Sequence, residues 1–232
     1  RTLLDRYRGQ VQGWDVVNEA IVDDGEYLRE TKWLKAIGED YLEHAFRFAH
    51  AADPHVELYY NDYNIERDAK RGRTLRLLRH LQSRGVRLDG VGIQGHWQLD
   101  KVPYDEITRA IEEYAALGLK VMFTELDIDV VDRLDAGADV SAHRSFPLSN
   151  PYPDGCPDEV LARQAEQYGR LFELFARYPD AVTRVTLWGM SDGMSWLNHW
   201  PGLRRNYPLL FDRESRPKPA FHSVAAALRL RA

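Results

Sequence analysis

Short apolar runs alternate along the chain with longer segments whose apolar residues recur at helical spacing. The apolar runs indicate buried strands at 11–17, 56–60, 90–93, 120–124 and 182–187. The helical spacing predicts helices over 31–52, 67–83, 103–117, 158–178 and 219–230, and the first nine residues are typical of a helix end. The charges of the basic helix 67–83 are expected on a solvated outer face. This alternation predicts an α/β fold in which helices cross over between parallel strands.

Each predicted strand ends in a cluster of polar or aromatic residues. The carboxyl ends of parallel strands meet on one side of a sheet, where the active sites of β/α barrels and open α/β sheets lie. No glycine-rich phosphate-binding fingerprint follows any strand, which disfavours a nucleotide-binding doubly wound sheet. We therefore expect a β/α barrel. A closed barrel has eight β/α units, and five can be found here.

Composition narrows the possible partners. The 232 residues carry a net charge of −5 with both signs interspersed, which excludes the basic face of a nucleic-acid-binding protein. No apolar run is long enough to span a bilayer, so no membrane partner is expected. Cys156 is the single cysteine and lies in a turn, where a free thiol is expected. Most of the six Trp and twelve Tyr are expected in the core, but several lie beside polar turn residues and could stack on sugar rings. The loop over 132–157 is too long for a mere connector, and loops of this length are usually functional or mobile.

The strand-end clusters match a family when they are taken in order. They are Val16-Val17-Asn18-Glu19-Ala20, Asn61-Asp62-Tyr63-Asn64, Gln94-Gly95-His96, Thr124-Glu125-Leu126-Asp127 and Trp188-Gly189 with Asp192 and Ser195-Trp196, followed by Leu210-Phe211-Asp212 and Pro217-Lys218-Pro219-Ala220. Together they closely resemble glycoside hydrolase family 10, the retaining endo-β-1,4-xylanases, over nearly the whole chain. The resemblance implies a (β/α)8 TIM barrel. Residues 1–232 would be the C-terminal portion of its single catalytic domain, strands four to eight.

Part of the family's barrel has no counterpart in this sequence. The family's first three β/α units carry a Lys, an Asn and a Trp-His pair that line the cleft, and nothing in this sequence corresponds to them. We expect either that a second polypeptide or segment supplies strands one to three, or that the chain is a fragment.

The resemblance implies two catalytic carboxyl groups. Glu19 would be the acid/base and Glu125 the nucleophile of a retaining reaction, which needs the two groups about 5–5.5 Å apart. His96 and Asp127 would support the nucleophile, with Asp127 holding His96 and His96 holding Glu125. Glu125 and Asp127 point to the same side of a strand because side chains alternate, so the Glu-x-Asp spacing suits this arrangement.

The resemblance also implies sugar-binding residues. Asn18 would hydrogen-bond the sugar 2-hydroxyl, a contact that strengthens in the transition state. Gln94 would lie beside the acid/base, and two tryptophans would wall the sugar at the cleavage point. The full predicted set is Asn18, Asn61, Tyr63, Asn64, Gln94, Trp188 and Trp196.

Ordinary structural roles remain open for several of these residues taken singly. Glu19 could cap a βα loop, His96 could be a hydrogen-bonded structural histidine, and either tryptophan could belong to the core. Glu19, His96, Glu125 and Asp127 could also be read as metal ligands, but the sequence has no His-x-His or His-Glu-x-x-His pair. We expect neither a metal nor another cofactor.

Three functions follow from these observations. The first is an endo-1,4-β-xylanase acting on xylan or xylo-oligosaccharides, secreted or periplasmic because the resemblance implies an extracellular polymer as substrate. The second is a related retaining β-glucanase. The third is a truncated, non-catalytic or weakly sugar-binding fragment whose open sheet edges would be a liability. Gln-x-His followed by Thr-Glu-Leu-Asp favours the first.

Overall fold

The computed structural model describes residues 2–132 and 149–229. The chain forms two compact units, which interleave along the sequence. The first comprises Arg1–Gln94, Asp105–Phe123 and Asp180–Arg184, and the second Gly95–Tyr104, Thr124–Pro179 and Val185–Ala232. Within the described ranges, no helix has the length and apolarity that a membrane span requires.

A parallel sheet is the centre of the first unit. Strands β1 (Gly13–Asn18), β2 (Glu57–Asp62) and β3 (Gly90–Ile93) lie in that order, and the beginning of β5 (Lys120–Asp129) pairs with β3. The register sets Asn18 beside Asn61 and Asp62 beside Ile93, so the strand ends are level with one another. Polar residues at these ends are therefore neighbours, as the strand pattern predicts.

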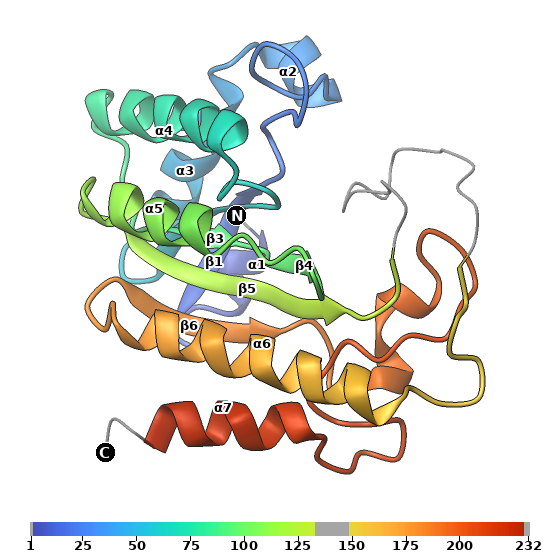
Figure 1. The fold of residues 1–232 in the computed structure, drawn as a ribbon. Coiled ribbons are helices and arrows are strands. Elements are labelled where there is room, and N and C mark those ends of the chain that lie inside the picture. The colour runs from blue at the N-terminus through green and yellow to red at the C-terminus, as the bar shows by residue number, and fades with distance from the viewer. Residues whose placement is uncertain (1, 133–148, 230–232) are drawn as a thin grey trace. The chain divides into compact units, whose positions relative to one another are not determined.

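The first unit also contains helices. They are α1 (Thr2–Arg6), α2 (Lys32–Ile37), α3 (Tyr41–Ala52), α4 (Asp68–Ser83) and α5 (Tyr104–Ala115), and α4 and α5 run side by side (Figure 1). Each of the three longer helices buries an apolar stripe, exemplified by Phe46 of α3, Leu78 of α4 and Ile111 of α5. Burial of such stripes is the main source of helix stability in a layered fold of this kind.

The second unit contains the rest of β5 and a pair of long helices. Strand β4 (His96–Gln98) pairs in parallel with β5, with His96 opposite Asp127. Strand β6 (Val182–Leu187) also pairs with β5, and α6 (Asp158–Ala176) and α7 (Pro219–Arg229) lie along one another (Figure 1). Two short 3-10 helices, η1 (Asp192–Met194) and η2 (Trp196–Asn198), follow β6.

Three details of the predicted elements were wrong. The helix predicted over 31–52 is two helices, because Gly38 adopts φ 84° and its amide closes α2 on Leu34 O at 2.9 Å. The strand predicted at 120–124 continues to Asp129, with Leu126 and Ile128 buried. Strand β4 was not predicted because Gly95, at φ 82°, separates it from β3.

The charges of α4 are also not all on an outer face. Lys70 and Arg71 are buried, and each is paired with carboxylates from elsewhere in the unit. The first helix ends at Arg6 rather than near Gly9, and the other predicted strands and helices lie within two residues of their observed bounds. Of the predicted loop over 132–157, residues 133–148 lie outside the described residues, as does Leu230.

Candidate active site

Glu19 directly follows the last residue of β1. Its amide donates to Asn61 O at 2.9 Å, which adds one bond to the ladder between β1 and β2. Its carboxyl Oε1 accepts a 2.9 Å hydrogen bond from Nε2 of Gln94, which follows β3. Asn61 in turn donates from Nδ2 to Oδ1 of Asn18 at 2.9 Å. Three neighbouring strand ends thus bring together four of the predicted site residues.

Tyr63 and Asn64 lie just beyond β2. Tyr63 is only 1% exposed; its hydroxyl accepts a 2.6 Å hydrogen bond from Arg29, and the Lys70 ammonium lies 3.6 Å from its ring centroid. Asn64 is half-buried and adopts φ 57°, a left-handed conformation that asparagine tolerates better than most residues. Direct sugar contacts by either residue stay a prediction.

In the second unit, His96 joins Glu125 to Asp127. Its Nε2 lies 3.2 Å from Oε2 of Glu125, and its Nδ1 lies 3.0 Å from Oδ1 of Asp127. The two carboxylates point to the same side of β5 because they are two residues apart on a strand. Pairing of β4 with β5 sets His96 opposite Asp127 and supplies the imidazole between them. His96 therefore contacts both carboxylates of the Glu-x-Asp pair, and the role of His96 and Asp127 as support of a nucleophile stays a prediction.

Trp196 completes this cluster from η2. Its Nε1 donates to the second oxygen of Asp127 at 2.8 Å, and its ring meets His96 edge to face with centroids 5.0 Å apart. Asp127 is fully buried and accepts from both the imidazole and the indole. The arrangement fixes the orientation of the imidazole through its far nitrogen.

The neighbouring carboxylates determine the protonation state of His96. Burial lowers the pKa of its imidazole, but the nearby Asp127 and Glu125 carboxylates outweigh that effect and raise the pKa to about 9. At neutral pH the ring is therefore a cation, and both ring nitrogens donate hydrogen bonds. A positive charge is thus held in hydrogen-bond contact with Glu125.

Trp188 follows β6 and is 45% exposed. Its amide donates to Leu126 O at 3.1 Å, which fixes its backbone against β5. Gly189 adopts φ 146°, and a Cβ there would come within 2.7 Å of the Leu209 side chain. The glycine therefore lets the chain turn directly after an exposed indole.

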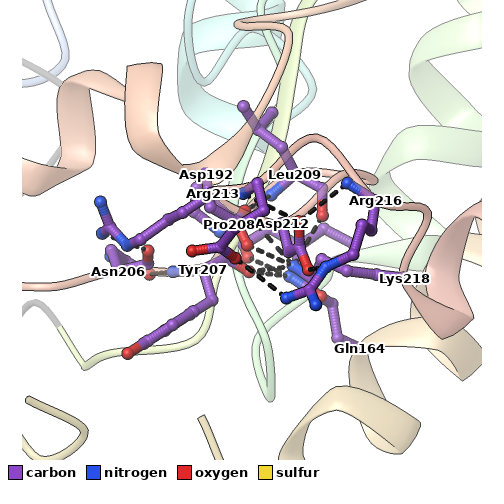
Figure 2. A network of polar contacts seen from close by, with 12 residues as sticks. Gln164, Asp192, Asn206, Tyr207, Pro208, Leu209, Asp212, Arg213, Arg216 and Lys218 are labelled. Carbon is purple, nitrogen blue, oxygen red and sulfur yellow. Dashed lines mark hydrogen bonds and ion pairs between the residues drawn. The ribbon is translucent and has the colours of Figure 1, made fainter. Parts of the chain in front are cut away.

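A network of polar contacts surrounds Asp192 and Lys218, which are both buried (Figure 2). Lys218 Nζ donates to the carbonyl oxygens of Tyr207 and Leu209 at 2.7 Å each and pairs with Asp192 Oδ2 at 3.1 Å. Leu209 N donates to Oδ1 of Asp192 at 2.8 Å. Asn198, the last residue of η2, donates from Nδ2 to the main-chain oxygen of Asp192 at 2.8 Å. Burial lowers the pKa of Lys218 and raises that of Asp192, and each partner opposes the change in the other.

Sequence reasoning assigned no role to three residues of these clusters. Tyr60 contacts the backbone after Glu19, Lys70 pairs with Asp62, and Arg29 contacts Tyr63. For Tyr60 the one available signal was strand alternation, which places Tyr60 and Asp62 on the same face of β2. In the described part of the chain, no group of three or more His, Cys, Asp or Glu side chains is placed to hold a metal ion.

Known proteins resemble this chain over almost its whole length. A family model for glycosyl hydrolase family 10 matches residues 1–227. The chain is 42% identical over 225 residues to an endo-1,4-beta-xylanase of Geobacillus stearothermophilus, covering 96% of this chain and 64% of that protein. It is 40% identical to endo-1,4-beta-xylanase A of Xylanibacter ruminicola, covering 96% and 61%. The chain thus spans less than two thirds of the length of these curated relatives.

Solved structures agree with the sequence comparison. A GH10 endoxylanase from a sugarcane soil metagenome superposes with a TM-score of 0.92 at 39% identity, covering 97% of this chain and 66% of that one. Xylanase XynB from Paenibacillus barcinonensis, complexed with a conduramine derivative, gives 0.84 at 40% identity, covering 96% and 64%. The predicted fold class is confirmed: the chain has the fold of the C-terminal portion of a (β/α)8 barrel.

Proposed function

The chain belongs to glycosyl hydrolase family 10, and from this we propose that the protein is an endo-1,4-β-xylanase that acts with retention of configuration. The observation that carries the proposal is the 3.2 Å contact of Glu125, within β5, with His96, whose pKa is raised to about 9. An ionised carboxylate held by a cation has the orientation and charge that a glycosidase nucleophile needs. Relatives at about 40% identity bear the name endo-1,4-beta-xylanase, which supports xylan as the substrate.

The proposed reaction has two displacement steps. In the first, a Glu125 oxygen attacks the anomeric carbon of a xylose unit while Glu19 gives its proton to the departing glycosidic oxygen. The C–O bond to the leaving sugar breaks and a covalent xylosyl–enzyme ester forms. In the second, Glu19 takes a proton from water, and the oxygen of that water displaces Glu125 from the anomeric carbon. Two inversions give net retention.

Each half of the site has support for its proposed role. Gln94 fixes one oxygen of Glu19 by its 2.9 Å hydrogen bond, which restricts the direction of the carboxyl group. His96 fixes Glu125, and Asp127 with Trp196 fixes His96. Positioning of this kind lowers the barrier because the reacting groups need little reorganisation when the substrate arrives.

The remaining predicted residues are proposed as sugar contacts. Asn18 would hold the 2-hydroxyl of the sugar that undergoes attack, and its side chain is already oriented by Asn61. Exposed Trp188 and half-buried Trp196 would form walls around that sugar. Asn61, Tyr63 and Asn64 would lie on the leaving-group side. Gln94 serves Glu19.

The activity is proposed for the protein with a complete substrate cleft. We propose that 1–232 belongs to a single catalytic barrel domain, as its C-terminal portion. The other three β/α units of the barrel, from a further segment or a second polypeptide, would complete the cleft. Because xylan is an extracellular polymer, we propose a secreted or periplasmic location.

Product analysis on xylan tests this proposal. The full-length protein is incubated with xylan, and early products are separated by chromatography alongside a parallel digest of a mixed-linkage β-glucan. We expect xylo-oligosaccharides of several lengths, since internal cleavage produces a range. Release of products only from the glucan would favour a β-glucanase instead.

A variant pair assigns that activity to Glu125. Glu125→Ala is expected to abolish turnover of xylan. The matched control is Glu214→Ala, which removes an exposed carboxylate in the same unit and should retain activity. Near wild-type activity of Glu125→Ala would overturn the assignment.

A further inference from the structure

The backbone at Glu19 is in an unusual conformation. Its φ of 56° lies in the left-handed region, which is strained for a residue with a Cβ. Such a conformation persists only where surrounding contacts determine it. One of these contacts is the ladder bond from Glu19 N to Asn61 O at 2.9 Å.

Tyr60 provides two further contacts from β2. The amides of Ala20 and Ile21 both donate to its hydroxyl oxygen, at 3.2 Å each. The hydroxyl donates in turn to Oδ2 of Asp62 at 2.5 Å. A hydroxyl has one hydrogen and two lone pairs, so this one is fully used, and Tyr60 is 0% exposed. Three consecutive amides, starting at Glu19, are therefore held by β2.

Asp62 sets the direction of that hydroxyl. An ionised carboxylate only accepts, so the Tyr60 hydrogen must point to it and the lone pairs must face the two amides. Asp62 is 0% exposed, and its Oδ1 pairs with Lys70 Nζ at 2.9 Å and accepts from Tyr63 N at 2.9 Å. Ile21 N also lies 3.4 Å from its Oδ2. Burial raises the pKa of Asp62 to about 6, although the Lys70 ammonium opposes that rise, so the carboxylate is ionised above about pH 6.

Lys70 also contacts Asp23, the last residue of the segment that begins at Glu19. Its ammonium lies 2.9 Å from Oδ1 of Asp23, four residues after Glu19. Arg73 from the next turn of α4 donates to the main-chain oxygens of Val22 and Asp23. The segment from Glu19 to Asp23 is thus fixed at both ends by β2 and α4.

Strand alternation explains how β2 contacts the region of Glu19 from both of its sides. Tyr60 and Asp62 are two residues apart and share one side of the strand. Asn61 between them faces the other side, where it contacts Asn18. The same strand therefore holds the sugar-binding amide on one side and the backbone of the acid/base on the other.

We propose that Tyr60 and Asp62 are positioning residues that fix the Glu19 turn and thereby aim its carboxyl group at the glycosidic oxygen. This inference rests on the proposed acid/base role of Glu19. Proton transfer requires the donor within hydrogen-bond reach of the leaving oxygen, and a misplacement of about 1 Å can cost on the order of 100-fold in rate. Neither Tyr60 nor Asp62 needs to touch the sugar.

Tyr60→Phe tests the proposal because it removes only the hydroxyl. In the full-length protein, kcat/KM is measured for a xylo-oligosaccharide and for an aryl xylobioside with an activated leaving group. We expect the first to fall about 10–100-fold and the second to change less than about 3-fold, since an activated group leaves without a proton. Loss of stability alone would lower both values together and leave their ratio unchanged.

Tyr59→Phe is the matched control. Tyr59 is the neighbouring buried tyrosine of β2, and its hydroxyl donates to Glu57 instead. Its variant should leave the ratio of the two kcat/KM values at the wild-type level. If Tyr60→Phe does not fold, the same two kcat/KM values are measured for Asp62→Asn, with the same selective loss expected. Equal losses on both substrates, or no loss on either, would overturn the proposal.

Glu19→Ala separates this inference from the proposed function. If Glu19→Ala shows the selective loss on the oligosaccharide and Tyr60→Phe does not, only the positioning role fails. If Glu19→Ala itself shows no selective loss, the acid/base assignment fails and the positioning role fails with it.

Discussion

His96 Nε2 lies 3.2 Å from Oε2 of Glu125, and the opposite ring nitrogen is held 3.0 Å from Asp127. These two contacts restrict the rotation of the imidazole with respect to the Glu125 carboxylate. Asp127 is itself fixed by the 2.8 Å hydrogen bond from Trp196. A cation locked between two carboxylates makes the pH dependence of this cluster predictable.

Stability should decline with pH through the titration of His96. Its pKa is raised to about 9, so its stabilisation is fully present below about 6.5 and is lost as pH rises through 9. A shift of this size corresponds to about 3 kcal/mol of unfolding free energy. We expect His96→Gln to flatten that decline in urea unfolding curves recorded from pH 6 to 10. Parallel pH dependence of the two proteins would contradict the raised pKa.

Removal of the Glu19 carboxyl group should affect both steps of turnover in distinguishable ways. Glu19→Ala is expected to lower kcat/KM for xylo-oligosaccharides by about 100-fold or more, the usual contribution of a general acid, and to spare activated aryl substrates in the first step. Added azide should then speed release of the xylosyl group as the β-azide, because an anion needs no general base.

The control for that experiment is Glu26→Ala, which removes an exposed carboxylate from the same loop. It should behave as wild type on both substrates and show no response to azide. Equal losses on all substrates in Glu19→Ala, without an azide effect, would remove Glu19 from the acid/base role.

The network of Figure 2 makes a prediction about stability. Lys218→Met leaves the Asp192 carboxylate buried without its cation and takes a donor from two carbonyl oxygens. Breaking a buried ion pair on one side typically costs about 3–5 kcal/mol, which denaturant unfolding would detect. Arg216→Met, which breaks only exposed pairs with Asp212 and Glu214, should change the unfolding free energy far less, because water screens exposed ion pairs. Similar losses in the two variants would show that burial of Lys218 does not matter.

Local patterns predicted the parts of the site that neighbouring strands create. Gln94 reaches Glu19 because β1, β2 and β3 end at the same level; strand order predicts neighbouring strand ends, and the family resemblance implied this particular pair. Glu125 and Asp127 share a face because strands alternate, and His96 meets them because β4 pairs with β5. The shared face of Glu125 and Asp127 depends on the strand period, which a sequence displays directly. The contact through His96 depends on β4, which was not predicted, and was implied only by the family resemblance.

Burial of polar residues was not predictable in the same way. Lys70 sits in a basic amphipathic helix, where the pattern favours a solvated face, and its partners Asp23 and Asp62 come from other elements. Tyr60 gave no signal beyond an apolar strand position, although its hydroxyl holds two amides. Gly38 stood inside a helical pattern that tolerates one glycine, so only its φ of 84° reveals the break. Such contacts are set by tertiary packing.

The configuration of the first product tests the proposed double displacement most directly. Proton NMR during the first minutes of xylo-oligosaccharide hydrolysis by the full-length protein resolves the α- and β-anomers of the new reducing end before they equilibrate. Attack by Glu125 followed by attack of water predicts the β-anomer first, with the α-anomer appearing only by mutarotation. An initial α-anomer would show a single displacement and would contradict the assignment of Glu125 as nucleophile.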